Sequence, residues 1–257
     1  MFYGRENERK KLCTMFHSDG QMISLIYGRR RIGKSELIKQ VLKETDIKSV
    51  YYECKQTTEQ NNVDSLAELI GEAFDFPKPA FENMEDLLCF LFQKSEKEPM
   101  ILVLDEYPYL RENSKGLDSV LQSVIDHYKD TSNMKLIVCG SYVDTMKALL
   151  ERQNPLYGRI DLTLNLKPMD YYDSALFYPE FSEEDKVRLF SVFGGIPYYN
   201  RLIDAKKSVR ENIIELIASS GARLENEVAM YLNSEISKIT RVLHLNMFVI
   251  TGYSFKL

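Results

Sequence analysis

The stretch Ile26–Ile38, IYGRRRIGKSELI, places three consecutive arginines between two glycines in a chain whose net charge is −5. Within it, Gly28–Ser35 matches the spacing G-x-x-x-x-G-K-[ST] of a phosphate-binding loop. Glycines allow the backbone to curl until its N–H groups point into one concavity, and a following helix adds the positive end of its dipole. The local positive charge therefore suits a triphosphate better than a long nucleic acid. A solvated basic turn is the plainer alternative.

The segments on both sides of this loop support the phosphate-binding interpretation. Met22–Tyr27 is a short apolar run that favours a buried strand, and apolar residues from Leu37 to Leu42 recur at helical spacing. We expect Lys34 to reach the β- and γ-phosphates and the Ser35 hydroxyl to ligate Mg²⁺. Backbone groups and Lys34 suffice for the phosphates, so one or more of the arginines is expected to face a helical domain or a partner surface. The candidate nucleotide-binding residues of this segment are Gly28, Arg29, Arg30, Arg31, Ile32, Gly33, Lys34, Ser35 and Glu36.

The composition is that of a globular protein with one large domain, or with a main domain and a smaller companion. The 257 residues are 44% hydrophobic and 28% charged, and the four cysteines form no C-x-x-C pair, which argues against a zinc ribbon or a redox dithiol. A pI near 5.4 argues against a strongly basic nucleic-acid binder. Because the sequence has no signal-like apolar core and no run of 18 apolar residues, we expect a cytoplasmic protein with free, buried thiols and no membrane partner.

Further apolar runs predict an α/β domain followed by helices. The predicted strands are Met22–Tyr27, Ser49–Cys54, Met100–Glu106, Lys135–Ser141 and Ile160–Leu166, the last more exposed than the others. A polar stretch follows the second strand, and helical spacing returns at Met84–Phe92 and at Leu117–Tyr128. Strands that alternate with helices indicate a mainly parallel sheet. From Pro168 onward only helices are predicted, one opened by Ser182 and the next by a capping box of Ser208 with Glu211.

Two carboxylates at the end of the third strand supply the chemistry that a phosphate loop lacks. The strand MILVLDE delivers Asp105 and Glu106 to the carboxyl edge of the sheet, where ligands bind in open α/β folds. Asp105 is then the Mg²⁺-associated acid, and Glu106 is the base that orients or deprotonates the attacking water. Ser141, just after the fourth strand, is either a hydrogen-bond partner of the γ-phosphate or water, or a simple turn serine.

Taken together, GRRRIGKS, LVLDEYPYL, CGS and PLYGR resemble the prokaryotic ATPases often called archaeal-type ATPases, of the STAND branch of P-loop NTPases close to the AAA+ proteins. FYGRENE, Phe2–Glu8, is similar to that branch's N-terminal box, which implies that Tyr3 and Arg5 lie near the base, the ribose or the phosphates, or that Arg5 braces the loop. GGIPYYN is similar to the G-x-P motif, which implies that Pro197 packs near the base; a turn between helices is the alternative.

The resemblance also implies a fold and a domain order. The fold is a P-loop NTPase three-layer sandwich with a parallel five-stranded sheet of order 5-1-4-3-2, followed by a small helical lid domain. We predict an ATPase core at residues 1–167, a helical lid at 168–222, and a partial segment at 223–257 that is at most the start of a winged helix.

The expected function is that of an ATP-binding ATPase that hydrolyses ATP slowly as a molecular switch, with ATP or ADP and Mg²⁺ as cofactors. Lys34, Glu106, Ser141 and Arg159 are the candidate catalytic residues, and Ser35 and Asp105 are the candidate metal ligands. Arg159 is either a transition-state arginine, acting in the same chain or a neighbouring one, or a structural arginine before the fifth strand. The alternatives are a nucleotide-binding regulatory module that does not hydrolyse, and a DNA-associated ATPase like the origin-recognition proteins. Partners other than nucleotide are a protein or a second copy.

Overall fold

The computed structural model describes residues 2–227 and divides the chain into two compact units. The first unit contains residues 2–177 together with Gly195–Tyr198, and the second contains Tyr178–Gly194 and the described residues 199–227. The predicted boundaries at residues 167 and 222 stay predictions. Most of the predicted segment 223–257, with its winged-helix start, lies outside the described residues.

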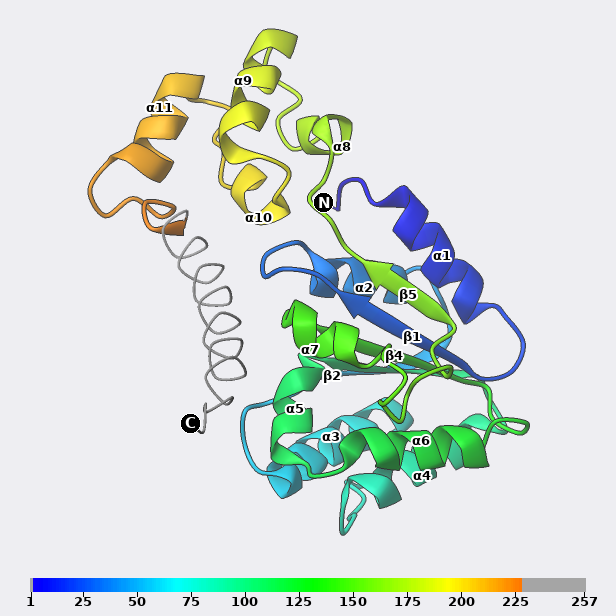
Figure 1. Cartoon of the computed structure of the whole chain (residues 1–257). Helices are drawn as coiled ribbons and strands as arrows, with labels where there is room; N and C mark the ends of the chain where they lie inside the picture. The colour runs from blue at the N-terminus through cyan, green and yellow to red at the C-terminus, as the bar shows by residue number, and fades with distance from the viewer. Residues whose placement is uncertain (1, 228–257) are drawn as a thin grey trace, which may run out of the picture. The chain divides into compact units, whose positions relative to one another are not determined.

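The first unit is built on a five-stranded sheet whose order is β2-β3-β4-β1-β5, with every pair parallel (Figure 1). This confirms the predicted order 5-1-4-3-2 read from the other edge. The strands are β1 (Met22–Tyr27), β2 (Lys48–Glu53), β3 (Met100–Asp105), β4 (Met134–Gly140) and β5 (Leu162–Asn165). In the register of the sheet, Tyr27 pairs with Gly140 and Glu53 pairs with Asp105, so the ends of four strands meet at one edge.

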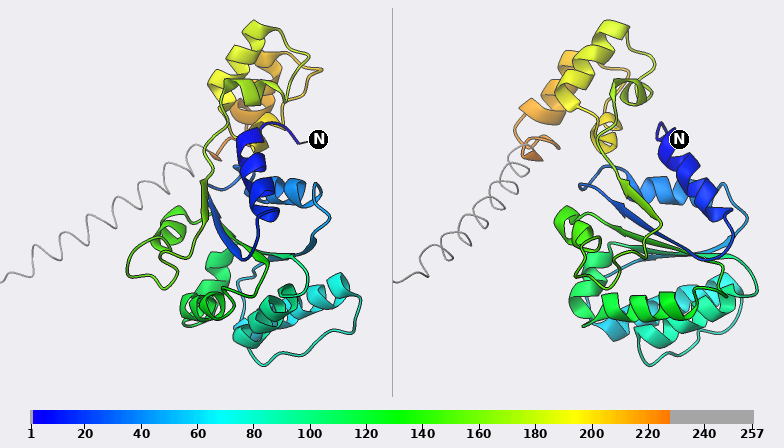
Figure 2. Two further views of the ribbon diagram at one scale, coloured as in Figure 1. Left: turned by 90° about the vertical axis from the view of Figure 1, so that its right-hand side faces the viewer. Right: turned by 45° about the vertical axis from the view of Figure 1, so that its right-hand side comes forward.

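The sheet has helices on both faces, which makes the first unit a three-layer sandwich (Figure 2). Every residue of β3 and β4 is buried, whereas the outer strands β2 and β5 are only partly buried. Continuous apolar runs such as MILVLD therefore reflect strands that are covered on both sides. The helices of this unit are α1 (Glu6–Phe16), α2 (Lys34–Leu42), α3 (Glu59–Phe74), α4 (Met84–Ser95), α5 (Tyr107–Asn113), α6 (Leu117–His127), α7 (Val143–Ala148) and α8 (Tyr171–Ala175).

Helix α3 corrects the prediction of a polar stretch after the second strand. Its first turn, EQNN, is polar, but Val63, Leu66 and Ile70 are fully buried and Thr58 caps its N-terminus by accepting from the Asn61 N–H at 3.3 Å. An apolar stripe at i, i+3 and i+7 was present in the sequence beneath a hydrophilic average.

The second unit is helical in its described part. It contains α9 (Glu183–Phe193), α11 (Val209–Ile213) and a π-helical turn at Ile214–Ala218, while α10 (Pro197–Asn200) begins in the first unit and ends in this one. Both predicted helix starts are confirmed, because Ser182 accepts from the Asp185 N–H and Ser208 forms the full capping box with Glu211. The apolar side chains that follow this cap are poorly covered, because Ile213, Leu216 and Ile217 are only half-buried and Ile214 is 43% exposed.

Two further observations concern the chain as a whole. No helix among residues 2–227 combines the length and the apolar character needed to cross a membrane. The four cysteines are free thiols as predicted, but only Cys54 and Cys139 are buried, whereas Cys13 and Cys89 are half-buried on helix surfaces.

Candidate functional site

The loop Gly28–Gly33 leaves β1 and enters α2 at the carboxyl edge of the sheet (Figure 1). A side chain at Gly28 would place its Cβ 2.6 Å from the carbonyl oxygen of Leu166, so the backbones approach too closely for any other residue. Gly33 caps α2 at φ 90° and Arg31 lies at φ 66°, both in the left-handed region. The loop is thus a curled backbone fixed at both ends, with the fully buried Ile32 anchoring its middle.

Lys34 is the first residue of α2 and lies inside the curve of the loop. It is 5% exposed, and its Nζ donates to the carbonyl oxygens of Gly28 at 3.0 Å and Arg29 at 3.3 Å. Carbonyl oxygens therefore hold the ammonium at the centre of the concavity that the backbone forms. An anionic ligand there would exchange these neutral acceptors for charged ones, which make stronger hydrogen bonds.

Ser35 and Asp105 meet beside Lys34, although they are 70 residues apart in sequence. The Ser35 Oγ donates to Asp105 Oδ2 at 2.6 Å, and the Glu106 N–H donates to the other carboxylate oxygen at 2.9 Å. A hydroxyl and a carboxylate oxygen side by side are hard donors of the kind that Mg²⁺ binds through one or two protein ligands. The donor set therefore fits the metal that the sequence predicted.

Tyr51 on β2 is a third partner of Asp105 and was not predicted. Its hydroxyl donates to Asp105 Oδ2, the oxygen that also accepts from Ser35. Burial raises the pKa of Asp105, but the hydrogen bonds from Ser35, Tyr51 and Cys139 outweigh burial and leave its pKa below the ordinary value. Burial and the adjacent carboxylate raise the pKa of Tyr51, which keeps its hydroxyl a donor. Asp105 is consequently an anion at neutral pH although it is only 1% exposed.

Glu106 caps α5 in the left-handed conformation, at φ 50°, and faces the end of β4. The Ser141 Oγ lies 2.6 and 2.7 Å from the two oxygens of its carboxylate, and the Ser141 N–H donates to Glu106 Oε2 at 3.3 Å. Ser141 therefore contacts the candidate base rather than being a simple turn serine. A non-glycine residue at positive φ is uncommon, and Glu106 adopts this conformation while its carboxylate contacts Ser141.

Arg5 in the N-terminal segment is a brace for the loop. It is 6% exposed, and its Nη2 donates to the carbonyl oxygens of Lys167 at 2.6 Å and Ile32 at 3.3 Å. Its own N–H donates to Asp173 Oδ2 at 3.2 Å, and the same carboxylate fills the space beside Gly4. The guanidinium thus ties the middle of the phosphate loop to the chain that leaves β5. Tyr3 packs on Phe177, with ring centroids 4.9 Å apart.

The G-x-P segment Gly195–Tyr198 belongs to the first compact unit and lies against the loop. The Pro197 Cγ lies 3.6 Å from the position of a Cβ on Gly33, and the Arg31 guanidinium lies over the Tyr198 ring at 4.5 Å. A Cβ on Gly195 would lie 1.8 Å from the carbonyl oxygen of Met169, so this backbone tolerates only glycine. The segment is therefore more than a turn between helices, and Arg31 is turned toward it.

The remaining predicted residues lie around or away from this site. Arg29 is half-buried, whereas Arg30 on the loop and Glu36 in the first turn of α2 are exposed. Arg159 is not brought to the loop. Its guanidinium makes hydrogen bonds of 2.8 and 2.7 Å with the two carboxylate oxygens of Asp126 at the end of α6. Because Arg159 precedes β5 in the chain, it lies at the amino edge of the sheet, opposite the loop. Within one chain the structure favours the structural alternative for Arg159.

Of the two site partners that the sequence analysis missed, Tyr51 had a weak signal in the sequence and Asp173 had none. In the second strand, Val50 and Tyr52 point to one face of the sheet, so Tyr51 between them points to the other face. That is the face on which Ser35 and α2 lie. Asp173 had no such signal, because nothing in the sequence links it to Arg5, 168 residues away.

Residues 2–204 match the family described as an ATPase domain predominantly from Archaea. The chain is 30% identical over 200 residues to an uncharacterized protein of Methanocaldococcus jannaschii, a match that covers 77% of this chain and 43% of that protein. It therefore spans less than half the length of this relative.

The fold is similar to that of the Walker-type ATPase of Pyrococcus abyssi, with a TM-score of 0.63 and 20% identity over 93% of this chain and 76% of that one. It is also similar to the ORC2 protein of Aeropyrum pernix in its ADPNP–ADP complexes, with a TM-score of 0.57 and 16% identity over 89% and 63% of the two chains.

Proposed function

The chain belongs to the family of ATPase domains found predominantly in Archaea, with an AAA+-like P-loop NTPase fold, and on this premise we propose that it is a slow, Mg²⁺-dependent ATPase that works as a molecular switch. Membership in the STAND branch and a cytoplasmic location are part of the same proposal. The observation that carries it is the contact between Ser35 Oγ and Asp105 Oδ2 at 2.6 Å, directly beside the buried Lys34.

Binding is assigned to the loop and to the residues that brace it. The backbone N–H groups of the loop and the N-terminus of α2 face the phosphates, and Lys34 exchanges its two carbonyl acceptors for phosphate oxygens. Ser35 and Asp105 would hold Mg²⁺, which would neutralise charge on the phosphate oxygens. Arg5 keeps Ile32 in place, and Pro197 and Tyr198 line the side of the loop at Gly33 and Arg31.

Hydrolysis is assigned to Glu106. Its carboxylate accepts a hydrogen bond from the attacking water and removes a proton while the oxygen of that water attacks the γ-phosphorus. The bond from the γ-phosphorus to the oxygen that bridges it to the β-phosphate breaks, so that ADP and inorganic phosphate leave. Ser141 already engages both oxygens of this carboxylate, and the water would donate to the lone pairs that Ser141 leaves free. The position of Arg159 away from the loop, paired with Asp126, supports slow turnover.

Two variants test the proposal. Lys34→Ala should lower ATP affinity by about 10²-fold, because charge-assisted hydrogen bonds to phosphate are lost. The control Lys43→Ala removes the same charge at the exposed end of α2 and should leave the affinity within about twofold of the wild type. Equilibrium dialysis with MgATP measures both. Equal affinities for the two variants would show that this loop is not the nucleotide site.

Glu106→Gln separates an ATPase from a binding module. It keeps the size of the side chain and an acceptor but removes the base, so MgATP should bind and stay intact while phosphate release falls by about 10²-fold or more. A wild-type protein that binds MgATP but releases no phosphate would instead establish the non-hydrolysing alternative.

A further inference from the structure

A second concave site lies on the first compact unit, beside the proposed ATPase site, and the charge of Arg30 on the phosphate loop acts on one of its lining residues, Tyr109. It is a cavity of about 900 Å³ bounded by α5, the start of α6, α7 and the segment that follows α7. None of its lining residues belongs to Gly28–Ser35. Its volume is within the range of ligand pockets, which is roughly 300–1,000 Å³.

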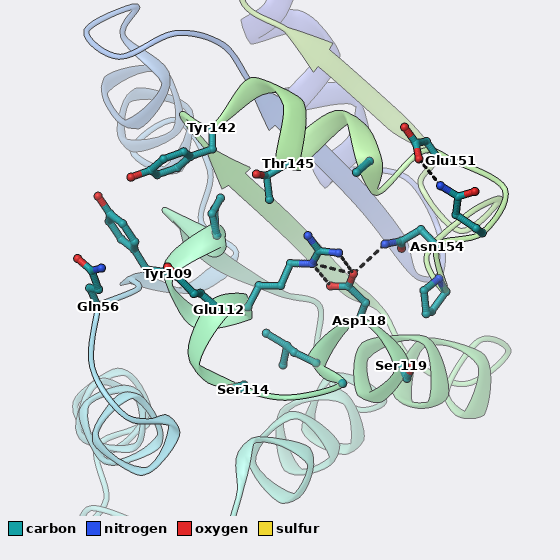
Figure 3. Close-up of a pocket in the computed structure, with 17 residues that line it drawn as sticks. Gln56, Tyr109, Glu112, Ser114, Asp118, Ser119, Tyr142, Thr145, Glu151 and Asn154 are labelled. Atoms are coloured by element: carbon teal, nitrogen blue, oxygen red, sulfur yellow. Dashed lines mark hydrogen bonds and ion pairs between the residues drawn. The ribbon is translucent and has the colours of Figure 1, made fainter. Parts of the chain in front are cut away.

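The lining of the cavity combines aromatic rings with uncompensated negative charge. Tyr109 and Tyr142 meet edge to face, with centroids 5.8 Å apart, and Tyr142 is 51% exposed. Asp118 is neutralised by Arg111, whose Nη2 lies 2.9 Å from its Oδ2. The exposed carboxylates of Glu112 and Glu151 then remain as the excess charge of the lining. Figure 3 shows the tyrosines on one side of the cavity and Glu151 with Asn154 on the other.

Asp118, on the side of the cavity formed by α5 and α6, already has its hydrogen-bond partners. Asp118 accepts hydrogen bonds from Tyr107 at 2.7 Å, from Asn154 at 2.8 Å and from the Arg111 Nε at 2.9 Å. A different polar group is left over. Ser114 lines the cavity and is 2% exposed, and its Oγ has no hydrogen-bond partner among residues 2–227. A buried hydroxyl without a partner is costly. Because the Ser114 Oγ is closed to solvent, a small shift of its segment is needed before an incoming carbonyl group can satisfy it.

We propose that this cavity binds a short basic segment of a partner protein. Carboxylates beside exposed aromatic rings recognise guanidinium and ammonium groups through charge and cation–π attraction. The separation of the tyrosines from Glu151 suits an extended peptide with more than one basic side chain, and Ser114 supplies a donor for its backbone.

The position of the cavity connects this peptide to the proposed ATPase cycle. Tyr142 directly follows Ser141, and Tyr109 is on the first turn of α5, which Glu106 caps. A ligand that contacts both tyrosines therefore contacts the neighbours of both members of the Ser141–Glu106 pair. Binding at the cavity should shift that pair and change the rate of hydrolysis, a consequence that rests on the proposed function.

The binding test uses the full chain and a peptide with fluorescein on its N-terminus, fluorescein-Gly-Arg-Ala-Arg-Gly-NH₂, with fluorescein-Gly-Glu-Ala-Glu-Gly-NH₂ as the acidic counterpart, in fluorescence polarisation. Only the basic peptide should bind. The double variant Glu112→Gln/Glu151→Gln should weaken it by about 5- to 30-fold. Glu68→Gln/Glu72→Gln, which removes two exposed charges from α3, should change the affinity by less than about twofold.

Ser114→Ala gives an independent check within the same assay. It should weaken the basic peptide by about 3- to 10-fold without lowering thermal stability, because the lost hydroxyl has no partner in the folded chain. Absence of binding up to about 5 mM peptide, or equal loss in the cavity and α3 variants, would overturn the site.

Phosphate release with and without saturating basic peptide then tests the connection to hydrolysis. The rate should change by about threefold or more in the wild type and stay constant in Glu112→Gln/Glu151→Gln. Binding with an unchanged rate would overturn the coupling and leave the site. A wild type without any phosphate release would refute the proposed function, while the polarisation result would still decide the site.

Discussion

The hydroxyl of Tyr51 offers a direct test of how Asp105 is kept charged in the interior. Tyr51→Phe removes one donor from a carboxylate that keeps Ser35 and the Glu106 N–H as partners, so no orphaned charge is created. A hydrogen bond to a charged group is worth about 1.5–3 kcal/mol, which predicts a loss of that size in the free energy of unfolding. For a chain of this length the melting temperature should fall by about 3–12 °C.

The neighbouring residue provides the matched control. Tyr52 points to the opposite face of β2 and donates to a neutral acceptor, the Asn62 Oδ1, at 2.6 Å, and this oxygen also accepts from the Lys55 N–H. Tyr52→Phe should therefore cost only about 0.5–1.5 kcal/mol. Thermal unfolding followed by circular dichroism compares the two variants, and Tyr51→Phe should in addition weaken Mg²⁺-dependent ATP binding by about tenfold.

The pH dependence of stability gives the sign of the effect. The folded-state pKa of Asp105 lies below its ordinary value of about 3.9. The hydrogen bonds to the carboxylate therefore stabilise the folded protein fully above about pH 3.9, and this stabilisation is lost as the pH falls through the folded-state pKa. The stability difference between wild type and Tyr51→Phe should thus be largest near pH 7 and should shrink below about pH 4. A difference that does not change between pH 3 and 7, or a cost no larger than that of Tyr52→Phe, would refute the reasoning.

Three other substitutions probe the frame of the site. Gly195→Ala would force a Cβ to 1.8 Å from the Met169 carbonyl oxygen and should cost about 3 kcal/mol or more in chemical denaturation. Gly116→Ala has open space around its Cβ and lies in the left-handed region at φ 77°, so it should cost only about 1–2 kcal/mol, and equal costs would contradict the close approach. Arg159→Ala removes a partly exposed ion pair, so it should change the free energy of unfolding by less than about 1 kcal/mol. Phosphate release should change by less than about twofold, and a loss of turnover of about 10²-fold would instead identify Arg159 as a transition-state arginine. Thr58→Ala removes the N-cap of α3 and should cost about 1 kcal/mol in thermal unfolding, and a neutral result would mean that water replaces the cap.

Local spacing in the sequence predicted the phosphate loop and the strands, whereas the order of the strands followed from the family resemblance. Glycines, Lys34 and Ser35 at fixed offsets define the loop because the phosphate-binding backbone is built from consecutive residues. The central strands were visible because strands buried on both faces must be apolar throughout, as β3 and β4 are. Even Arg159 could have been placed, since a residue just before a parallel strand lies at the amino edge, opposite the phosphate loop.

The tertiary structure alone decided which side chains meet. Tyr51, Ser35 and Cys139 surround Asp105 from three different segments, and Arg5 reaches the carbonyls of Ile32 and Lys167 from the N-terminus. The cavity beside α5 and α7 is likewise defined only when both helices are packed. Spacing along the chain determines which backbone a segment can adopt, but contacts between segments depend on the register of the sheet and on side-chain packing, which no local pattern specifies.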